Sequence, residues 1–254
     1  MIATSNVLGV GVSATNLRGA ATEIDRWIAA GERHYVCVSG VHGIMESQRD
    51  PEVKAIHNRA GLVLPDGMPL AWWVRSQHRD ADRVCGPEFM PLLLDRSQRT
   101  GYGHFFYGSS EKALADLQKT VGRRYPEARI VGSYSPPFRP LNPEEDAAIV
   151  AAINASGADI VWVGLSTPKQ EQWMAAHRAQ LDARVLIGVG AAFDLLAGHV
   201  ERAPKFIRRT GFEWAYRLMI EPRRLWRRYL MNNPVFMVMA AAQVTRLAKF
   251  PLER

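Results

Sequence analysis

Two aspartates follow apolar runs that are typical of buried strands. Asp66 comes directly after "LVLP" (62–65), and Asp194 lies in "AAFDLL" (191–196), just after "RVLIGVG" (184–190). A carboxylate at the mouth of a site can act as a general base when burial tunes its affinity for a proton. Simpler interpretations stay open: Asp66–Gly67 as a turn, and Asp194 as a helix-start residue that accepts from backbone N–H groups.

Arginines gather near the end of the chain. "EPRRLWRRYL" (221–230) holds four arginines and two aromatic residues, and residues 201–254 carry 12 Lys/Arg against 4 Asp/Glu. Residues 1–200 carry 20 against 21, so the basic excess is local. A guanidinium can bind a phosphate through two parallel hydrogen bonds. This pattern favours a local anion site over a surface that coats nucleic acid, with a solvated charged helix as the plain alternative.

A third candidate is the loop "LSTPKQEQW" (165–173), which follows the apolar run 159–164. A strand, a short polar loop and a helix start together offer free backbone N–H groups to a phosphate or a polar base. The "GVG" triplets at 9–11 and 188–190 do not extend to GxGxxG, so a nicotinamide cofactor is poorly supported. The chain also lacks HExxH, a Walker loop, GxSxG and an Asp-x-Asp pair. We therefore predict neither a cofactor nor a bound metal.

The elements that must position these residues alternate along the chain. Helix-like stretches separate short β-branched or aromatic runs, which predicts an α/β fold with a mostly parallel sheet and helices on both faces. The expected strands are 6–12, 34–38, 61–64, 104–108, 128–132, 159–164 and 184–190, and the expected helices include 21–31, 111–125, 143–156 and 168–181. In such a sheet, ligands bind beyond the carboxyl ends of the strands. From about residue 202 the strand signal ends and basic, aromatic helix follows.

Composition limits the class of protein. The chain has 254 residues, of which 47% are hydrophobic and 22% charged, as in ordinary globular proteins. Cys37 and Cys85 lie far apart with no signal-peptide pattern ahead of them, which indicates reduced thiols in a cytosolic protein. The apolar run 234–244 is much shorter than the ~20 residues that a spanning helix needs. Whether this run inserts into a membrane interface or packs on the core stays open.

Four ordered blocks carry a resemblance to a known family. They are "LVLPDGMPLAWW" (62–73), "VGLSTPKQEQWM" (163–174), "GVGAAFDLLAGHVERAP" (188–204) and "GFEWAYRLMIEPRRLWRRYL" (211–230). Together they are similar to the WecG/TagA/CpsF family, glycosyltransferase family 26, over about residues 7–232. The resemblance implies a Rossmann-like catalytic core, here residues 1–201, and a C-terminal helical appendage, here 202–254, that closes over the site and contacts the membrane.

The resemblance also implies an activity. Members are inverting, metal-independent glycosyltransferases that move a sugar from a UDP-sugar onto a polyprenyl-diphosphate-linked acceptor, in the synthesis of surface polysaccharides and teichoic-acid linkage units. We accordingly expect a peripheral protein on the cytoplasmic face of the cell membrane, with anionic lipid as a neighbour and no nucleic acid partner. A homo-oligomer stays open, as does the identity of the donated sugar.

Site residues follow from the matching motifs. By resemblance, Asp66 is the general base, Gln170 lines the donor pocket and Arg83 binds substrate. The appendage arginines that close on the diphosphate are Arg217, Arg224 and Arg227. Asp194 is a further candidate substrate-binding residue. On one continuous helix the three appendage arginines would share a face, and Arg223 and Arg228 would point elsewhere, toward lipid.

One block departs from the family pattern. Members commonly have Thr-x-Asn after the second strand, whereas this chain has "SGV" (39–41). Ser39 keeps the hydroxyl as a candidate substrate-binding group, and Val41 replaces the amide. An N-acetylmannosamine donor therefore cannot be assumed, and a hexose or uronic acid of an exopolysaccharide is as plausible.

Two alternatives belong to other classes of protein. A catalytically silent scaffold that recruits polysaccharide enzymes to the membrane would tolerate the loss of Asp66. A nucleic-acid-binding protein would use the basic tail, and its affinity would fall steeply with salt and ignore UDP.

Overall fold

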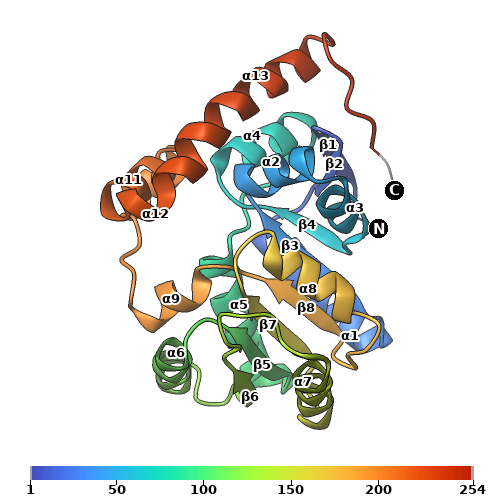
Figure 1. The fold of residues 1–254 in the computed structure, drawn as a ribbon, viewed down its shortest axis with the longest axis vertical. Coiled ribbons are helices and arrows are strands. Elements are labelled where there is room, and N and C mark those ends of the chain that lie inside the picture. Colours follow the sequence, from blue (N-terminus) through green and yellow to red (C-terminus); the bar gives the residue numbers. More distant parts are fainter. Residues whose placement is uncertain (1, 253–254) are drawn as a thin grey trace. The chain divides into compact units, whose positions relative to one another are not determined.

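The centre of the fold is a six-stranded sheet in the order β4-β3-β8-β7-β5-β6, seen here in a computed structural model (Figure 1). The structure describes residues 2–252, apart from the side chains of Lys205, Arg209 and Arg224. The strands are β3 (His34–Ser39), β4 (Leu62–Pro65), β5 (Gly103–Gly108), β6 (Arg129–Tyr134), β7 (Ile160–Gly164) and β8 (Val185–Gly188). The pairs β3/β8, β8/β7, β7/β5 and β5/β6 are all parallel. The prediction of a Rossmann-like, mostly parallel α/β fold is confirmed.

The chain divides into two compact units. Unit 1 contains Met1–Leu17, Val38–Cys85 and Arg202–Arg254, and unit 2 contains Arg18–Cys37 and Gly86–Glu201. The last segment of unit 1 begins at residue 202, where the strand signal ends in the sequence. The assignment of 1–201 as catalytic core and 202–254 as appendage stays a prediction.

Helices surround the sheet strands of unit 2. They are α1 (Leu17–Ala30), α5 (Gly86–Thr100), α6 (Glu111–Arg124), α7 (Pro143–Ala155), α8 (Lys169–His177) and α9 (Ala192–Ala197). Local sequence explains where two of them begin. The Ser110 hydroxyl accepts from the N–H of Ala113 at the start of α6, and Asn142 and Glu145 form a reciprocal capping box at α7. Trp173 of α8 stacks on Tyr107 of β5, with 4.1 Å between the ring centroids.

The first predicted strand, 6–12, is wrong. This segment is a hairpin of β1 (Thr4–Val7) and β2 (Val10–Ser13), paired antiparallel. Leu8 and Gly9 form its turn with φ angles of 51° and 79°. The run looks continuous in the sequence because the residue before Gly9 is a leucine rather than a polar turn former.

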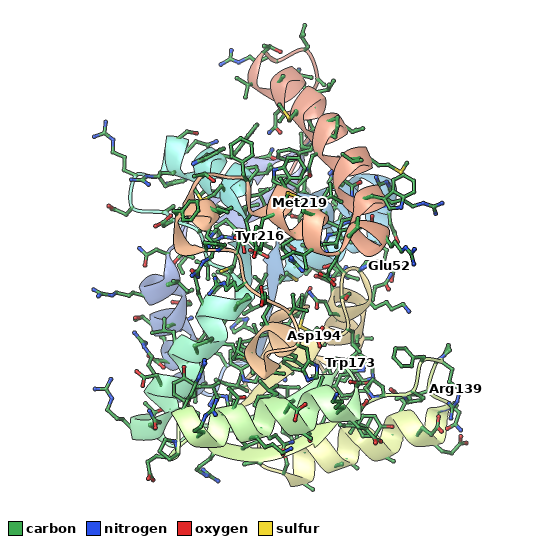
Figure 2. All side chains as sticks on the ribbon, turned by 90° about the vertical axis from the view of Figure 1, so that its left-hand side faces the viewer. Glu52, Arg139, Trp173, Asp194, Tyr216 and Met219 are labelled. Atoms are coloured by element: carbon green, nitrogen blue, oxygen red, sulfur yellow. The ribbon has the colours of Figure 1, made fainter. Side chains whose placement is uncertain are left out.

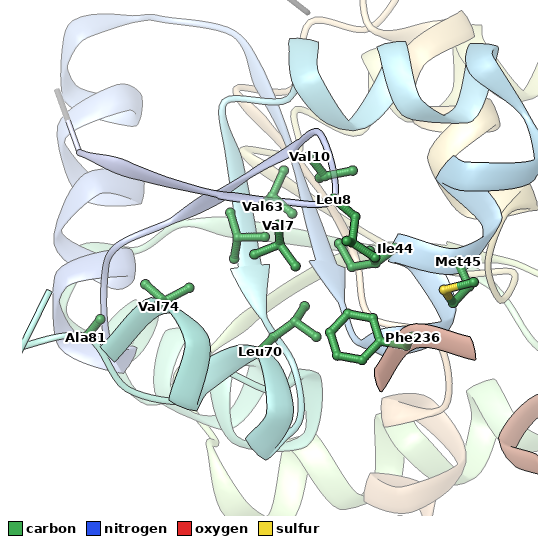
Figure 3. Packing of buried hydrophobic residues seen from close by; sticks show 11 residues of the cluster. Val7, Leu8, Val10, Ile44, Met45, Val63, Leu70, Val74, Ala81 and Phe236 are labelled. Carbon is green, nitrogen blue, oxygen red and sulfur yellow. The ribbon is translucent and has the colours of Figure 1, made fainter. Parts of the chain in front are cut away.

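The rest of unit 1 packs against this hairpin. Its helices before residue 86 are α2 (Val41–Arg49), α3 (Pro51–Arg59) and α4 (Met68–Gln77). Side chains from the hairpin, α2, β4, α4 and α13 (Asn232–Val244) form one buried cluster (Figure 3). Phe236 is the residue that α13 contributes, and it lies beside Leu70 and Ile44. Gln243 of α13 also bonds the hairpin backbone at Leu8 N–H, 2.8 Å, and at the Asn6 carbonyl, 3.0 Å.

The basic segment before α13 is not one continuous helix. It consists of α10 (Lys205–Arg209), α11 (Glu213–Ile220), α12 (Pro222–Trp226) and a π-helix, η1 (Arg227–Met231). Glu221, with φ −125° and ψ 58°, separates α11 from α12. The prediction that Arg217, Arg224 and Arg227 share a face of one helix is therefore wrong, because α11 ends before Pro222 and η1 has a wider turn.

The apolar run 234–244 has two different faces. Phe236 is buried in the cluster of unit 1, whereas Met237, Val238 and Val244 are each 70% exposed. One face therefore packs on the core, and the other is exposed to solvent. In residues 2–252, no helix combines the length and the apolar character needed to cross a membrane.

Candidate active site

Asp66 lies between β4 and α4 in unit 1. Its backbone N–H donates to the Ser39 carbonyl at 2.9 Å, which ties it to the end of β3. Gly40 lets the start of α2 approach this loop, because a Cβ at Gly40 would lie 2.9 Å from the Asp66 carbonyl oxygen. The Asp66 side chain is partly buried. The carboxylate is thus held at the carboxyl end of β4, as the sequence predicts.

The surroundings of Asp66 suit a group that takes up a proton. Burial raises the pKa of its carboxyl above the ordinary value, and the charge of Glu213 adds to this rise. The cations of Arg83, Arg217 and Arg228 act in the opposite direction. Desolvation is the largest of these effects, so the carboxyl binds a proton more tightly than an exposed aspartate does.

Arg83 is held next to the Asp66 loop by backbone and side chain. The N–H of Val84 donates to the Pro65 carbonyl at 3.0 Å, so the segment that carries Arg83 runs beside the end of β4. The Arg83 side chain is only 9% exposed, and its Nη1 donates to Glu213 Oε2 at 2.5 Å. The sequence had not singled out Glu213, which belongs to the first turn of α11.

The other arginines of the C-terminal segment differ in their surroundings. Arg217 is mostly buried and lies 4.0 Å from Glu221. Arg228 is half-buried, and its positive charge lowers the pKa of Asp66. This differs from the expectation that Arg228 points away toward lipid. Arg227 is exposed, with its guanidinium 5.3 Å from the ring centroid of Trp226. Arg224 belongs to α12, but its side chain lies outside the described residues.

The Ser39 hydroxyl is engaged inside unit 1. It lies 2.7 Å from His57 Nε2, and the serine is only 1% exposed. His57 Nδ1 is 2.9 Å from the Val53 carbonyl, which can only accept, so Nδ1 carries the proton and the serine donates to Nε2. Val41, which stands in place of the family's amide, packs against the apolar cluster of unit 1. The role of Ser39 in substrate binding stays a prediction.

Gln170 joins two loops of unit 2. Its Oε1 accepts from the N–H of Gly190, after β8, at 3.0 Å, and its Nε2 donates to Glu171 Oε1 at 3.0 Å. The Thr167 hydroxyl donates to the same carboxylate oxygen at 2.9 Å. Gln170 and Glu171 are both buried. The loop after β7 is thereby fixed to the loop after β8, with Glu171 as a partner that the sequence did not predict.

Asp194 lies in the first turn of α9, also in unit 2 (Figure 2). Its Oδ1 accepts from the Ser109 hydroxyl at 3.2 Å. Ser109 follows β5 with φ 61°, and Ser166 follows β7 with φ 65°. Non-glycine residues in this left-handed region are uncommon and gather at functional sites. At the carboxyl ends of β5, β7 and β8, hydroxyl, carboxylate and backbone N–H groups thus gather and bond one another.

Each unit therefore assembles its own set of site residues. In unit 1 the structure brings Asp66 together with Arg83 and Arg217, and adds Glu213 and Arg228. In unit 2 it gives Gln170 and Asp194 partners at the carboxyl ends of the strands. Over the described part of the chain, no three His, Cys, Asp or Glu side chains lie where they could hold a metal ion together.

Comparison with known protein families identifies the family of this chain. Residues 5–249 match the model of the glycosyl transferase WecG/TagA/CpsF family. The match covers nearly the whole chain, including both units and the C-terminal helices.

Proposed function

The chain belongs to the WecG/TagA/CpsF family of glycosyl transferases, whose role is in polysaccharide synthesis, and we propose the specific reaction as follows. The protein moves a sugar from a UDP-sugar onto a polyprenyl-diphosphate-linked saccharide, with inversion at the anomeric carbon and without a bound metal. The observation that carries the proposal is the carboxylate of Asp66 at the end of β4, which is desolvated and whose pKa is influenced by the charges of Arg83, Arg217 and Arg228.

Asp66 acts as the general base in this mechanism. It takes the proton from the acceptor hydroxyl as the oxygen forms a bond to the anomeric carbon of the donor. The bond from that carbon to the β-phosphate oxygen breaks, and UDP leaves with the electron pair. A single displacement of this kind inverts the anomeric carbon and needs no covalent nucleophile. The raised pKa supports the role, because a stronger base accepts a proton more readily in the transition state.

The leaving diphosphate needs compensating positive charge. Guanidinium groups supply it through fixed hydrogen bonds, which are strongest where water is excluded. Arg83 and Arg217 are both largely buried, and Arg228 acts on Asp66 with them. Arg224 joins this group on the basis of the family resemblance, which also offers Arg227; because Arg227 is exposed, the half-buried Arg228 is the stronger candidate of these two.

The nucleoside of the donor is proposed to bind in unit 2, at the carboxyl ends of β5, β7 and β8. Asp194 and Ser109 offer an acceptor and a hydroxyl to a ribose, and the loop of Ser166 lies at the start of α8. Gln170 keeps that loop against Gly190. In α/β sheets of this kind, nucleotides bind beyond the carboxyl ends of the strands.

The polyprenyl acceptor requires contact with a membrane. The exposed apolar residues of the last helices include Met219, Trp226, Leu230, Met237 and Val238. The sequence has no acidic residue between Glu221 and Glu253, and basic residues flank the uncharged stretch 229–245. Apolar side chains beside cations are typical of segments that lie in an anionic lipid interface. We therefore propose a peripheral location on the inner face of the cell membrane.

The test is a release assay for UDP. A panel of UDP-sugars is offered with polyprenyl-diphosphate sugars, and the pair that releases UDP identifies donor and acceptor. Asp66→Asn is expected to lower turnover by about 10²–10⁴-fold while UDP binding stays near normal. Asp80→Asn, an exposed aspartate of unit 1, is the matched control and should behave as the wild type. Wild-type turnover in the Asp66 variant would refute the assignment of the base and make Asp194 the next candidate, whereas no UDP release with any donor and acceptor pair would favour a non-catalytic scaffold.

Metal independence has its own test. Activity should survive EDTA, because the arginines supply the positive charge that a divalent ion supplies in other transferases. Loss of activity on chelation, with recovery on adding magnesium or manganese, would contradict this part of the proposal.

A further inference from the structure

We propose that Glu213 is a positioning residue for the reaction: its carboxylate holds the Arg83 guanidinium beside Asp66 and keeps a balancing negative charge there. The inference rests on the proposed function, because it takes Asp66 to be the general base. It assigns a role to a residue that neither the motifs nor the spacing of the sequence had singled out.

The contact between the two residues is short and sheltered. Arg83 Nη1 and Glu213 Oε2 are 2.5 Å apart, with side-chain exposures of 9% and 26%. Both partners are charged, which makes the hydrogen bond stronger than one between neutral groups. A guanidinium that is this deeply buried requires a partner, because an unpaired charge out of water is costly. Glu213 therefore helps to fix where the Arg83 guanidinium lies.

Glu213 reaches this position from a distant part of the sequence. It starts α11, directly after Gly211 and Phe212. Gly211 packs so closely on Trp72 that a Cβ there would lie 2.7 Å from the indole. Trp72 belongs to α4, the helix that follows Asp66 and Gly67. The start of α11 is thus fixed on the same helix that begins at the proposed base.

The balance of charge around Asp66 depends on Glu213. Four charged groups influence the pKa of Asp66: the cations of Arg83, Arg217 and Arg228 and the carboxylate of Glu213. The cations lower the pKa of Asp66 and Glu213 raises it. Without Glu213, three cations would stabilise the ionised form, and Asp66 would become a weaker base. The same substitution would also leave the Arg83 guanidinium without its carboxylate.

The pH dependence of kcat/KM tests the inference. Glu213→Gln keeps the shape of the side chain and removes the charge. We expect the acid limb of the profile to move to lower pH by about one unit, since a like charge at short range has been removed. At neutral pH we expect kcat/KM to fall about tenfold as Arg83 loses its orientation. An acid limb at the wild-type position would overturn the proposal, whatever the change in rate.

A matched control is available in the same unit. Glu46 pairs with Arg49 at 2.6 Å and is 22% exposed, close to the exposure of Glu213, but it is not among the charges that act on Asp66. Glu46→Gln should leave the acid limb where it is. A shift of equal size in this variant would mean that Glu213 acts only through the net charge of the protein.

A double variant covers the case in which Glu213→Gln fails to fold. In Arg83→Gln/Glu213→Gln neither partner of this ion pair keeps its charge. If Glu213 acts through Arg83, the double variant should be no less active than Arg83→Gln alone. A double variant that is less active than Arg83→Gln would overturn the proposal. The result for Asp66→Asn separates this failure from a failure of the proposed function, because Glu213 can lack a role while Asp66 remains essential.

Discussion

Gly211 lies against the indole of Trp72, and a Cβ at Gly211 would lie 2.7 Å from Cη2 of that ring. The φ angle of Gly211 is +81°, a region that residues with a side chain rarely adopt. Two constraints therefore coincide where the C-terminal segment meets α4. The steric constraint is the close contact with Trp72, and the conformational constraint is the positive φ of Gly211. Both require glycine at the point where the start of α11 packs on the helix after Asp66.

Gly211→Ala is expected to loosen this connection. The substitution adds both a steric clash and about 1–2 kcal/mol of strain in the left-handed region. We expect faster proteolysis within residues 202–220 and a lower turnover, with the Asp66 loop still in place. Limited proteolysis followed by mass spectrometry measures the first effect, and UDP release measures the second.

Two controls separate the causes. Gly31 has φ +69° and open space around it, so Gly31→Ala adds strain without a clash. Trp72→Ala/Gly211→Ala removes the clash and leaves the strain. If Gly211→Ala is no more sensitive to protease in 202–220 than the wild type, the Gly211–Trp72 contact does not hold the segment.

A second prediction concerns acid stability and His104. This residue is fully buried in β5 of unit 2, where its Nδ1 accepts from Trp162 Nε1 at 2.9 Å. Burial lowers the pKa of the imidazole from 6.5 to about 3. The unfolded chain therefore binds a proton near pH 6.5, whereas the folded protein does not until about pH 3. The contribution of His104 to the free energy of unfolding is fully present above pH 6.5. It is lost as the pH falls toward 3, by up to about 1.4 kcal/mol per pH unit.

His104→Asn isolates this contribution. Asparagine keeps an acceptor for the Trp162 indole N–H but does not titrate. Urea unfolding at pH 7, 5 and 4 should give a flatter pH dependence for the variant than for the wild type, even if the variant is less stable at pH 7. Parallel curves for the two proteins would show that His104 titrates normally.

The third prediction concerns the membrane. Met237 and Val238 are each 70% exposed on α13. Met237→Ser/Val238→Ser should weaken flotation with anionic vesicles about tenfold, because the apolar side chains no longer enter the interface. The binding should also weaken with salt, since each basic residue near the surface contributes ~1 kcal/mol before screening.

This double substitution is a sharper test than truncation after residue 201. Truncation would remove Phe236 from the buried cluster of unit 1 and so disturb folding. The double variant leaves Phe236 in place, and its melting temperature should match the wild type. Equal flotation of the variant and the wild type would exclude this face as the lipid contact.

Much of the fold is predictable because buried parallel strands leave a strong pattern. The runs at 104–108 and 159–164 are mostly apolar, and every residue of β5 and the first four residues of β7 are buried, since both faces of these strands are covered. The hairpin was missed because Leu8 occupies its turn. The break at Glu221 had a signal, the following proline, which disfavours helix at the preceding residue. The position of Asp66 at the end of β4 was predictable from the sequence, as was the position of Gln170 at the start of α8, and the roles of both stay predictions.

The side chains that surround Asp66 and Arg83 could not be predicted from local sequence patterns. Glu213 pairs with a residue 130 positions away, and no local pattern identifies such a contact. Arg228 was assigned to the lipid side by assuming 3.6 residues per turn from Arg217. The break at Glu221 and the π-helix at Arg227–Met231 change that geometry. The sequence therefore predicts which residue types gather near Asp66 more reliably than which individual arginines do.

The last prediction separates Arg228 from Arg227. Arg228 is half-buried and its charge acts on Asp66, whereas Arg227 is exposed over Trp226. A membrane surface responds to summed charge, so lysine at either position would preserve adhesion. A diphosphate clamp needs the planar guanidinium, which an ammonium cannot reproduce. Arg228→Lys should therefore lower kcat/KM about tenfold, or ~1.4 kcal/mol, on a detergent-soluble acceptor, and Arg227→Lys should change it little.

The family resemblance gives Arg224 and Arg227 a role in the clamp and gives none to Arg228. Arg224→Lys and Arg223→Lys therefore belong in the same series, with a loss expected for the first and little change for the second. A loss in Arg227→Lys without one in Arg228→Lys would favour the resemblance over the geometry of η1. Small, equal effects at all four positions would show that residues 223–228 anchor the protein and take no part in transfer. Because the assay contains no bilayer, a weaker membrane contact cannot produce any of these losses.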